Sequence, residues 1–287
     1  MTADLTASTS ATWPARLVRP QMGWVTLIAG LLFAAVLLMA ALGGLIAPHD
    51  AAAQDLLRGA TGPSAGHILG TDELGRDIFS RLIVGARTAV LGPLVIAVAT
   101  TTLSTVLGLL AGYLGGWTDG VVGRLTDIVY ALPPLLVAIV VVGILGGGLP
   151  LGVLVLVVLN IPAGYRSMRA ATLEQRSLPY IETAKVLGEP KWRIMWHHVL
   201  PNVRPILYTT FFLSFTYGFV DLSTLSFLGL GVSPGTPDWG RMAAESRVLI
   251  FQNPWAVIAP LAMIVIAAVS ANLVGQGLDR RTAGRNR

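Results

Sequence analysis

The sequence predicts an all-α protein that crosses a membrane six times. Of its 287 residues, 54% are hydrophobic and only 12% are charged, about half of the roughly 25% that soluble domains carry. The charges are confined to short islands, and the uncharged runs between them are long enough for helices of about 20 apolar residues, the length that spans a bilayer. These runs place spans near 22–47, 86–114, 123–146, 149–168, 203–222 and 254–277.

The first span lies in a stretch without ionisable groups between Arg19 and His49. It is longer than the apolar core of a cleaved signal peptide, and no convincing small-residue cleavage site follows it. We therefore expect it to remain as a membrane anchor, preceded by a tail of residues 1–21.

The stretch between the first and second spans predicts an amphipathic helix on the outer membrane surface. Thr71 can cap this helix, and acidic residues follow in its first turn. Two pairs of opposite charge at i,i+4 spacing, Asp72–Arg76 and Asp77–Arg81, then support it.

The alternative interpretation of the same stretch is a metal site made of His67, Asp72 and Asp77. Side chains five residues apart do not share one face of a helix, so these three do not converge. The adjacent His197 and His198 point in different directions on a helix and are equally poor joint ligands. We expect no metal site in this chain.

The second span ends in a stripe of small residues. Gly108, Gly112 and Gly116 are four residues apart, a spacing that lets two helix backbones approach closely. The sequence predicts a helix-packing face here, and the partner can be another helix of the same chain.

The third and fourth spans share one uncharged run, 128–165, which is too long for a single crossing. The segment 146–150, Gly-Gly-Gly-Leu-Pro, divides it. The pair Pro133-Pro134 should kink the third span and Pro162 the fourth, since proline removes a backbone hydrogen bond.

The last two spans complete the topology. The fifth reaches span length only if Arg204 extends its charge toward the lipid headgroups. An even number of spans puts both termini on one side. The outer regions then hold six of the 20 Lys and Arg residues, namely Arg58, Arg76, Arg81, Arg87, Arg241 and Arg247, and the inner regions hold the other 14. Because inner loops carry the excess of basic residues, we expect a cell-membrane protein with both termini in the cytoplasm.

Several kinds of chemistry are missing from the sequence. There is no cysteine, no HExxH and no GxSxG, and neither Lys185 nor Lys191 belongs to a phosphate-binding P-loop. The chain therefore lacks the motif for ATP hydrolysis. The net charge of +5 does not indicate a nucleic-acid partner, because the topology already explains the basic excess.

An ion-coupled transporter usually carries ionisable groups inside its spans. The nearest candidates are Asp127 and Asp221, and both lie close to predicted span ends. Arg124, three residues before Asp127, is a ready helical partner for that carboxylate. We interpret both residues as interfacial carboxylates.

Charged residues are concentrated in the loop 177–201, between two apolar segments. The pattern of this loop predicts two short helices. Pro179 and Glu182 suit a first turn, Gly188 suits a helix end, and a second helix runs from Pro190 to Pro201. Ile181, Ala184 and Gly188 then form a small face for close approach by a partner, flanked by Lys185, Lys191 and Arg193. The alternative is an amphipathic segment lying on anionic headgroups.

The stretch ETAKVLGEPKWRIMWHHVLP, residues 182–201, resembles the EAA motif of ABC-importer permeases. The match falls on Glu182, Ala184, Gly188, Leu200 and Pro201, with Thr183 in place of the middle alanine. The resemblance implies that this loop, including Lys185, is a coupling helix that docks on a separate ATP-binding subunit.

Two further stretches, residues 67–87 and 225–242, resemble the C-type permease of dipeptide, oligopeptide and nickel importers. The likeness covers most of residues 67–278 and implies a type I ABC-importer permease fold over 86–278. The first helix and an external segment, 22–85, would precede this core, and a cytoplasmic tail, 279–287, would follow it.

The resemblance also implies the partners. They are a homologous B-type permease, two ATP-binding domains that hold ATP and Mg²⁺, and an extracytoplasmic substrate-binding protein, all at the lipid bilayer. This chain itself would carry no cofactor and would not be an enzyme.

The resemblance implies import of di- or oligopeptides, with nickel chelates as the main alternative. A weakly charged path with few fixed ligands suits cargo that varies in side chain. The rival functions are an ion-coupled secondary transporter and a structural membrane anchor. The sequence identifies no substrate-binding residues.

Overall fold

The computed structural model describes the backbone of residues 22–284 and the side chains of residues 23–278. The predicted tail 1–21 and the end of the tail 279–287 lie outside the described residues. In chain order the helices are α1 (Met22–Ile46), α2 (Ile78–Leu114), α3 (Gly116–Tyr130), α4 (Pro134–Ile144), α5 (Leu149–Arg176), α6 (Pro179–Val186), α7 (Lys191–Arg193), η1 (Ile194–Val199), α8 (Leu200–Asn202), α9 (Arg204–Phe227), α10 (Trp239–Glu245), η2 (Ser246–Leu249) and α11 (Trp255–Gly284). The described part contains no β-strand, so the predicted all-α class is confirmed.

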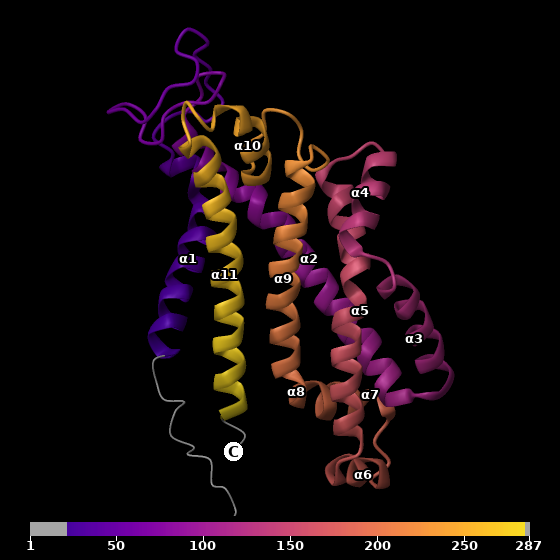
Figure 1. Ribbon diagram of the computed structural model, residues 1–287. Helices are drawn as coiled ribbons and strands as arrows, with labels where there is room; N and C mark the ends of the chain where they lie inside the picture. Colours follow the sequence, from indigo (N-terminus) through magenta and orange to yellow (C-terminus); the bar gives the residue numbers. More distant parts are fainter. Residues whose placement is uncertain (1–21, 285–287) are drawn as a thin grey trace, which may run out of the picture.

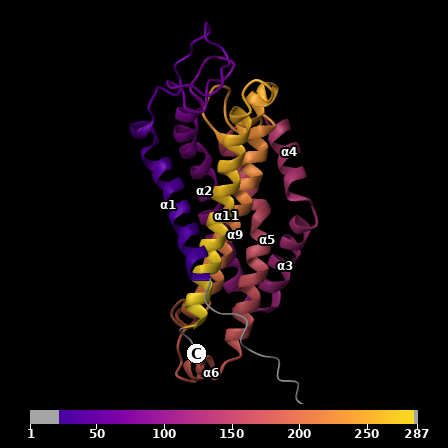
Figure 2. The same cartoon turned by 60° about the vertical axis from the view of Figure 1, so that its left-hand side comes forward.

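The long helices form one bundle with two distinct ends (Figure 1). Helices α1, α11, α9 and α5 run side by side, while the 37-residue α2 crosses the bundle obliquely and contacts all four. A second view shows the same arrangement, with α3 and α4 along one edge (Figure 2). Helix α10 and the segment between α1 and α2 cover one end, and α6, α7 and α8 form the other. These are called the α10 end and the α6 end below.

The structure confirms four of the six expected membrane spans by length and composition. Helices α1, α2, α5 and α11 are long and apolar enough to cross a bilayer, and α3 with α4 makes a fifth candidate if the bent pair is one span. Helix α9 lies where the fifth span was predicted. Its 24 residues include Tyr, Thr, Ser and Asp221, which lower its hydropathy. The structure therefore supports four or five spans, and six are not confirmed.

The bend between α3 and α4 is far sharper than the predicted kink. The two helices meet at 80° across a break before Pro134. Pro133 is extended at ψ 114°, a conformation that suits a residue preceding proline. The expected single third span is thus a broken pair of helices.

Helix α2 approaches α5 through two of the three glycines of the predicted stripe. A Cβ atom on Gly108 would lie 2.7 Å from the Cβ of Met168, and one on Gly112 would lie 2.8 Å from the Cβ of Thr172. Gly116 lies outside this contact. It adopts φ +58° at the corner between α2 and α3, where an added Cβ would have no neighbour within 4 Å.

The expected surface helix starting at Thr71 is not present. The chain turns between residues 71 and 77, and α2 starts at Ile78 with Asp77 as its N-cap, whose carboxylate accepts a 2.7 Å hydrogen bond from the Ser80 N–H. Burial alone would raise the pKa of Asp77, but hydrogen bonds from Ser80 and His67 and the nearby His49 hold it below its usual value.

The predicted pair Asp72–Arg76 forms, with a 2.7 Å hydrogen bond between Arg76 Nε and Asp72 Oδ2. The predicted pair Asp77–Arg81 does not. Because the chain is not helical before Ile78, the buried Arg81 guanidinium lies 3.7 Å from Asp72 and 3.6 Å from Glu245 instead. These charges join the α1–α2 segment to α10.

The α2–α5 contact gives a direct test of the packing. Gly112→Ala places a methyl group against Thr172, and overpacking of this kind destabilises by about 1–3 kcal/mol. Gly120→Ala in α3 is the matched control, because an added Cβ there meets nothing within 4 Å. We measure the melting temperature of the purified protein in detergent. It should fall for Gly112→Ala and should stay unchanged or rise for Gly120→Ala. Equal melting temperatures for the two variants would contradict the close contact.

Candidate functional site at the α6 end

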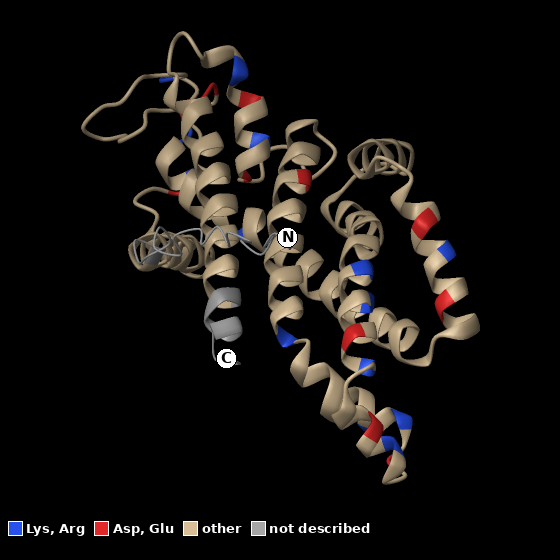
Figure 3. Cartoon of the chain, turned by 60° about the horizontal axis from the view of Figure 1, so that its bottom comes forward, with Lys and Arg blue, Asp and Glu red and all other residues tan. Residues whose placement is uncertain are grey.

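The candidate site is the segment 177–203, which projects beyond the long helices at the α6 end (Figure 1). It connects the end of α5 to the start of α9, so a force on the segment reaches both helices directly. Charged residues gather on this segment, while most of the length of the long helices is bare of charge (Figure 3).

Helix α6 is short and has a sharply defined end. Pro179 occupies its first turn, where the missing N–H costs no hydrogen bond. The chain then stops being helical at Gly188, which adopts φ +77°, a conformation that glycine accepts without strain. The Glu189 N–H closes the turn by donating to the Ala184 carbonyl at 3.1 Å. The predicted helix end at Gly188 is confirmed.

One side of α6 packs on the protein's own core. Ile181 is fully buried and Ala184 is 5% exposed, in a cluster with Ile194, Met195 and Val199. The expected face of Ile181, Ala184 and Gly188 therefore does not form a free surface. The small side chain of Ala184 allows α6 to lie close to the helical segment that follows it.

The opposite side of α6 and the turn after it form an exposed tip. Val186 is 87% exposed and Leu187 74%, and Glu182, Lys185 and Gly188 are exposed beside them. An added Cβ at Gly188 would have no neighbour within 4 Å. We call Glu182 and Lys185–Gly188 the α6 tip. It combines two exposed aliphatic side chains with charges of both signs.

Sequence reasoning missed Val186 and Leu187 as surface residues. Both are apolar, so composition alone assigns them to a core. The signal that could have found them is the helical period, since Ile181 and Ala184 define the buried stripe and Val186 lies away from it.

The second arm of the segment is one continuous helical stretch from Lys191 to Asn202 with a π-helical centre, η1. The expected helix from Pro190 to Pro201 is thus close to the observed one. Glu189 accepts a 3.0 Å hydrogen bond in a pair with His198, which ties the turn to this arm. Leu200 and Pro201 are half-buried, so they join the arm to α9 rather than belonging to the exposed tip.

A basic hollow lies behind the tip, between the end of α2 and the start of α7. Tyr113, Arg176, Lys185 and Lys191 line it, and Glu189 supplies the acidic group. Arg176 reaches the Gly112 carbonyl at 3.5 Å. Leu109 and Tyr113 of α2 belong to the same buried cluster as Ile181 and Ala184 of α6, so α6 packs near the part of α2 that contacts α5.

Two ion pairs fasten α3 to α5 near this end. Arg169 donates to both carboxylate oxygens of Asp119 at 2.5 Å, and Arg166 donates to Asp127 at 2.6 Å. Arg124 was expected to partner Asp127, but the ion pair of Asp127 within the described part of the chain is with Arg166. The carboxylate of Asp127 therefore links α3 to α5.

Asp221 lies half-buried on α9. Within residues 23–278 the structure gives its carboxylate no ion pair or hydrogen bond.

The sequence of this chain matches a known protein family. Residues 104–284 match the model described as "binding-protein-dependent transport system inner membrane component". The glutathione transport system permease protein GsiD of Pectobacterium atrosepticum is 36% identical over 255 residues, covering 88% of this chain and 85% of the relative. The di/tripeptide transport system permease protein DppC of Pseudomonas aeruginosa is 39% identical over 260 residues, with the same two coverages.

A solved structure shows a similar fold. A chain from the inward-facing MetNI methionine ABC transporter superposes with a TM-score of 0.50 at 18% identity. The match covers 68% of this chain and 94% of that chain. The helices of this protein therefore adopt an importer-permease fold. Helix α1 and the segment after it precede the residues that match the family.

Proposed function

Because this chain belongs to the family of binding-protein-dependent transport system inner membrane components, we propose that it is one permease subunit of an ATP-driven peptide importer. The observation that carries this proposal is the α6 tip, where the exposed Val186 and Leu187 stand above the buried Ile181 and Ala184 at one end of the bundle. Family membership does not fit the rival functions of ion-coupled transporter or structural anchor.

The α6 tip would receive an ATP-binding subunit, which supplies the ATP and Mg²⁺ chemistry that this chain's sequence lacks. Val186 and Leu187 would enter an apolar groove of that subunit, and Glu182 and Lys185 would pair with charges at its rim. Since Ile181 and Ala184 fix α6 to the segment 194–199, the tip moves together with its base.

Movement of this base would reach the spans through covalent connections. The segment leaves α5 at Arg176 and enters α9 at Arg204. Closure of the ATP-binding domains would shift both helices, while the contacts of α2 with α5 and α9 transmit the shift across the bundle. The described chain provides half of such a path, and a homologous B-type permease would provide the other half.

The distribution of basic residues supports a cytoplasmic location for the α6 end. The segment 177–203 carries Arg193, Lys185 and Lys191, while the α10 end faces an extracytoplasmic substrate-binding protein. The apolar outer surfaces of α1, α4 and α9 would contact lipid or the partner permease.

The two relatives described above are named for glutathione and for di/tripeptide transport, so we assign short peptides as the cargo. Neither name refers to nickel, and the nickel-chelate alternative gains no support from them. Peptides share backbone polarity and terminal charges, which suits a bundle whose spans carry few fixed charges.

Coupling is tested by a substitution at the tip. Leu187→Asp places a carboxylate in the proposed apolar groove, where an unpaired charge is strongly unfavourable. We expect substrate-stimulated ATPase activity of the reconstituted complex to fall about tenfold or more, which corresponds to a hot-spot loss above about 1.4 kcal/mol. Leu187→Met is the matched control and should retain stimulation.

An assembled Leu187→Asp complex with the stimulation of the unchanged protein would contradict the proposed docking. Leu187 is preferable to Gly188 for this test. A side chain at Gly188 would be strained at φ +77° whether or not a partner binds there.

Orientation is tested with single accessible tags in intact cells. A tag near Glu189 should be shielded from impermeant reagents, and tags near Gly62 and Gly235 at the α10 end should react. Reaction of the Glu189 tag from outside would contradict the assignment of the α6 end to the cytoplasm.

Cargo is tested by uptake of labelled di- and tripeptides in cells with and without this gene, with nickel uptake measured in parallel. We expect loss of peptide uptake and unchanged nickel uptake in the deletion strain. Loss of nickel uptake alone would overturn the assigned cargo while leaving the coupling mechanism intact.

A further inference from the structure

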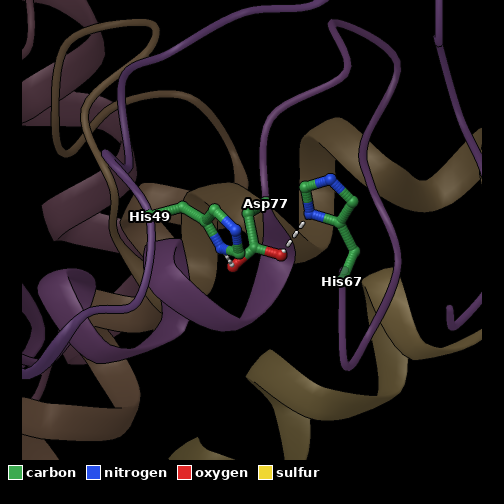
Figure 4. Close-up of side chains that lie close together, drawn as sticks. All are labelled: His49, His67 and Asp77. Carbon is green, nitrogen blue, oxygen red and sulfur yellow. Dashed lines mark hydrogen bonds and ion pairs between the residues drawn. The ribbon is translucent and has the colours of Figure 1, made fainter. Parts of the chain in front are cut away.

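Three side chains from separate parts of the α10 end meet at one point (Figure 4). His49 follows the end of α1, His67 lies in the turned segment before α2, and Asp77 is the N-cap of α2. Their nearest ligand atoms all lie within 4.8 Å of one another. His67 Nδ1 is 2.8 Å from Asp77 Oδ1, and His49 Nδ1 is 3.7 Å from Asp77 Oδ2.

The backbone fixes all three residues in place. The His49 N–H donates to Ser80 Oγ at 3.0 Å. His67 exchanges two backbone hydrogen bonds with Ser64, at 2.9 and 3.1 Å. Asp77 is held at the start of α2 by its capping bond to Ser80. The cluster is therefore organised by the fold and not by chance rotation of surface side chains.

We propose that His49, His67 and Asp77 form a binding site for a divalent transition-metal ion of the Zn²⁺ type. Two imidazole nitrogens and one carboxylate oxygen are a donor set that Zn²⁺ prefers, whereas Mg²⁺ and Ca²⁺ prefer oxygen ligands alone. Asp77 can serve two purposes at once, since Oδ2 caps the helix and Oδ1 faces His67.

The geometry requires a modest closure. Two ligands of a tetrahedral Zn²⁺ at about 2.0–2.1 Å lie about 3.4 Å apart, so a separation of up to 4.8 Å must shrink by about 1.4 Å. His49 has the freedom for this shift, because its side chain is 46% exposed, while His67 and Asp77 are 14% and 2% exposed. The exposed side leaves a fourth position for water.

A simple hydrogen bond between His67 and Asp77 does not account for the whole cluster. His49 also turns its ring toward the same carboxylate, with 5.0 Å between the two imidazole centroids. The ion pairs of Asp77 within the described residues are with these two histidines, while the neighbouring arginines pair with Asp72 and Glu245. A dication would supply the positive charge that balances this buried carboxylate.

A bound ion would join the end of α1, the turned segment and the start of α2. These are the parts that lie before the family match. The site would stabilise the segment between α1 and α2, at the end of the bundle opposite the α6 tip.

The test is Co²⁺ binding to the full-length protein, purified in its complex with an affinity tag that contains no histidine. We expect one saturable ion per chain with the visible absorption of a four-coordinate Co²⁺ site, displaced by Zn²⁺ and not by Mg²⁺ or Ca²⁺. His49→Gln should weaken binding at least about tenfold, because loss of a direct ligand costs no less than loss of a supporting residue.

Two features keep the result decisive. His49→Gln preserves the His67–Asp77 bond and the cap of α2, so the fold is retained. His197→Gln at the α6 end is the matched control and should bind Co²⁺ as the unchanged protein does. Absence of a saturable signal, or equal binding by His49→Gln, would overturn the proposal.

Discussion

The close contact between α2 and α5 is the constraint on which the rest of the structure depends. Gly108 and Gly112 bring the α2 backbone against Met168 and Thr172, and Gly164 brings α5 against α2 in turn. In a lipid environment such packing replaces the hydrophobic effect as the attraction between helices. Because α5 continues into the segment 177–203, the same contact determines where the α6 tip stands.

The two ends of the bundle use polar groups differently. At the α10 end, buried charges such as Arg81 are paired across distant segments, which closes that end as one unit. At the α6 end, Ile181 anchors the tip through apolar packing, and the charged Glu182 and Lys185 are exposed. A packed base below an exposed tip is the arrangement that the proposed coupling to an ATP-binding subunit requires.

Much of the fold follows from the sequence, because a lipid environment demands long uncharged helices. The runs around α1, α2, α5 and α11 predicted those helices directly. The start of α2 was harder to predict. Thr71 looks like a cap, but its hydroxyl instead bonds to Thr61 and Gly59, and Asp77 is the cap. The proline pair before α4 predicted a kink, whereas the two helices meet at 80° and both contact α5.

The sequence predicted where the candidate site lies in the chain, but not which of its side chains are exposed. Motif spacing located the segment, yet it could not show that Ala184 is buried and Leu187 exposed, because that depends on where the arm 191–202 folds back. His49 gave no signal either, since it lies 28 residues from Asp77 and only the turned segment brings them together.

The central claim is that the α6 tip contacts an ATP-binding subunit. The chain contains no cysteine, so Leu187→Cys gives it a single thiol that a short thiol–amine cross-linker can attach to a neighbour. Leu57→Cys, at an exposed position at the α10 end, is the control. Cross-linking in membranes should join position 187, and not position 57, to the ATP-binding subunit. A reactive thiol at 187 that yields no such adduct in the assembled complex would contradict the account.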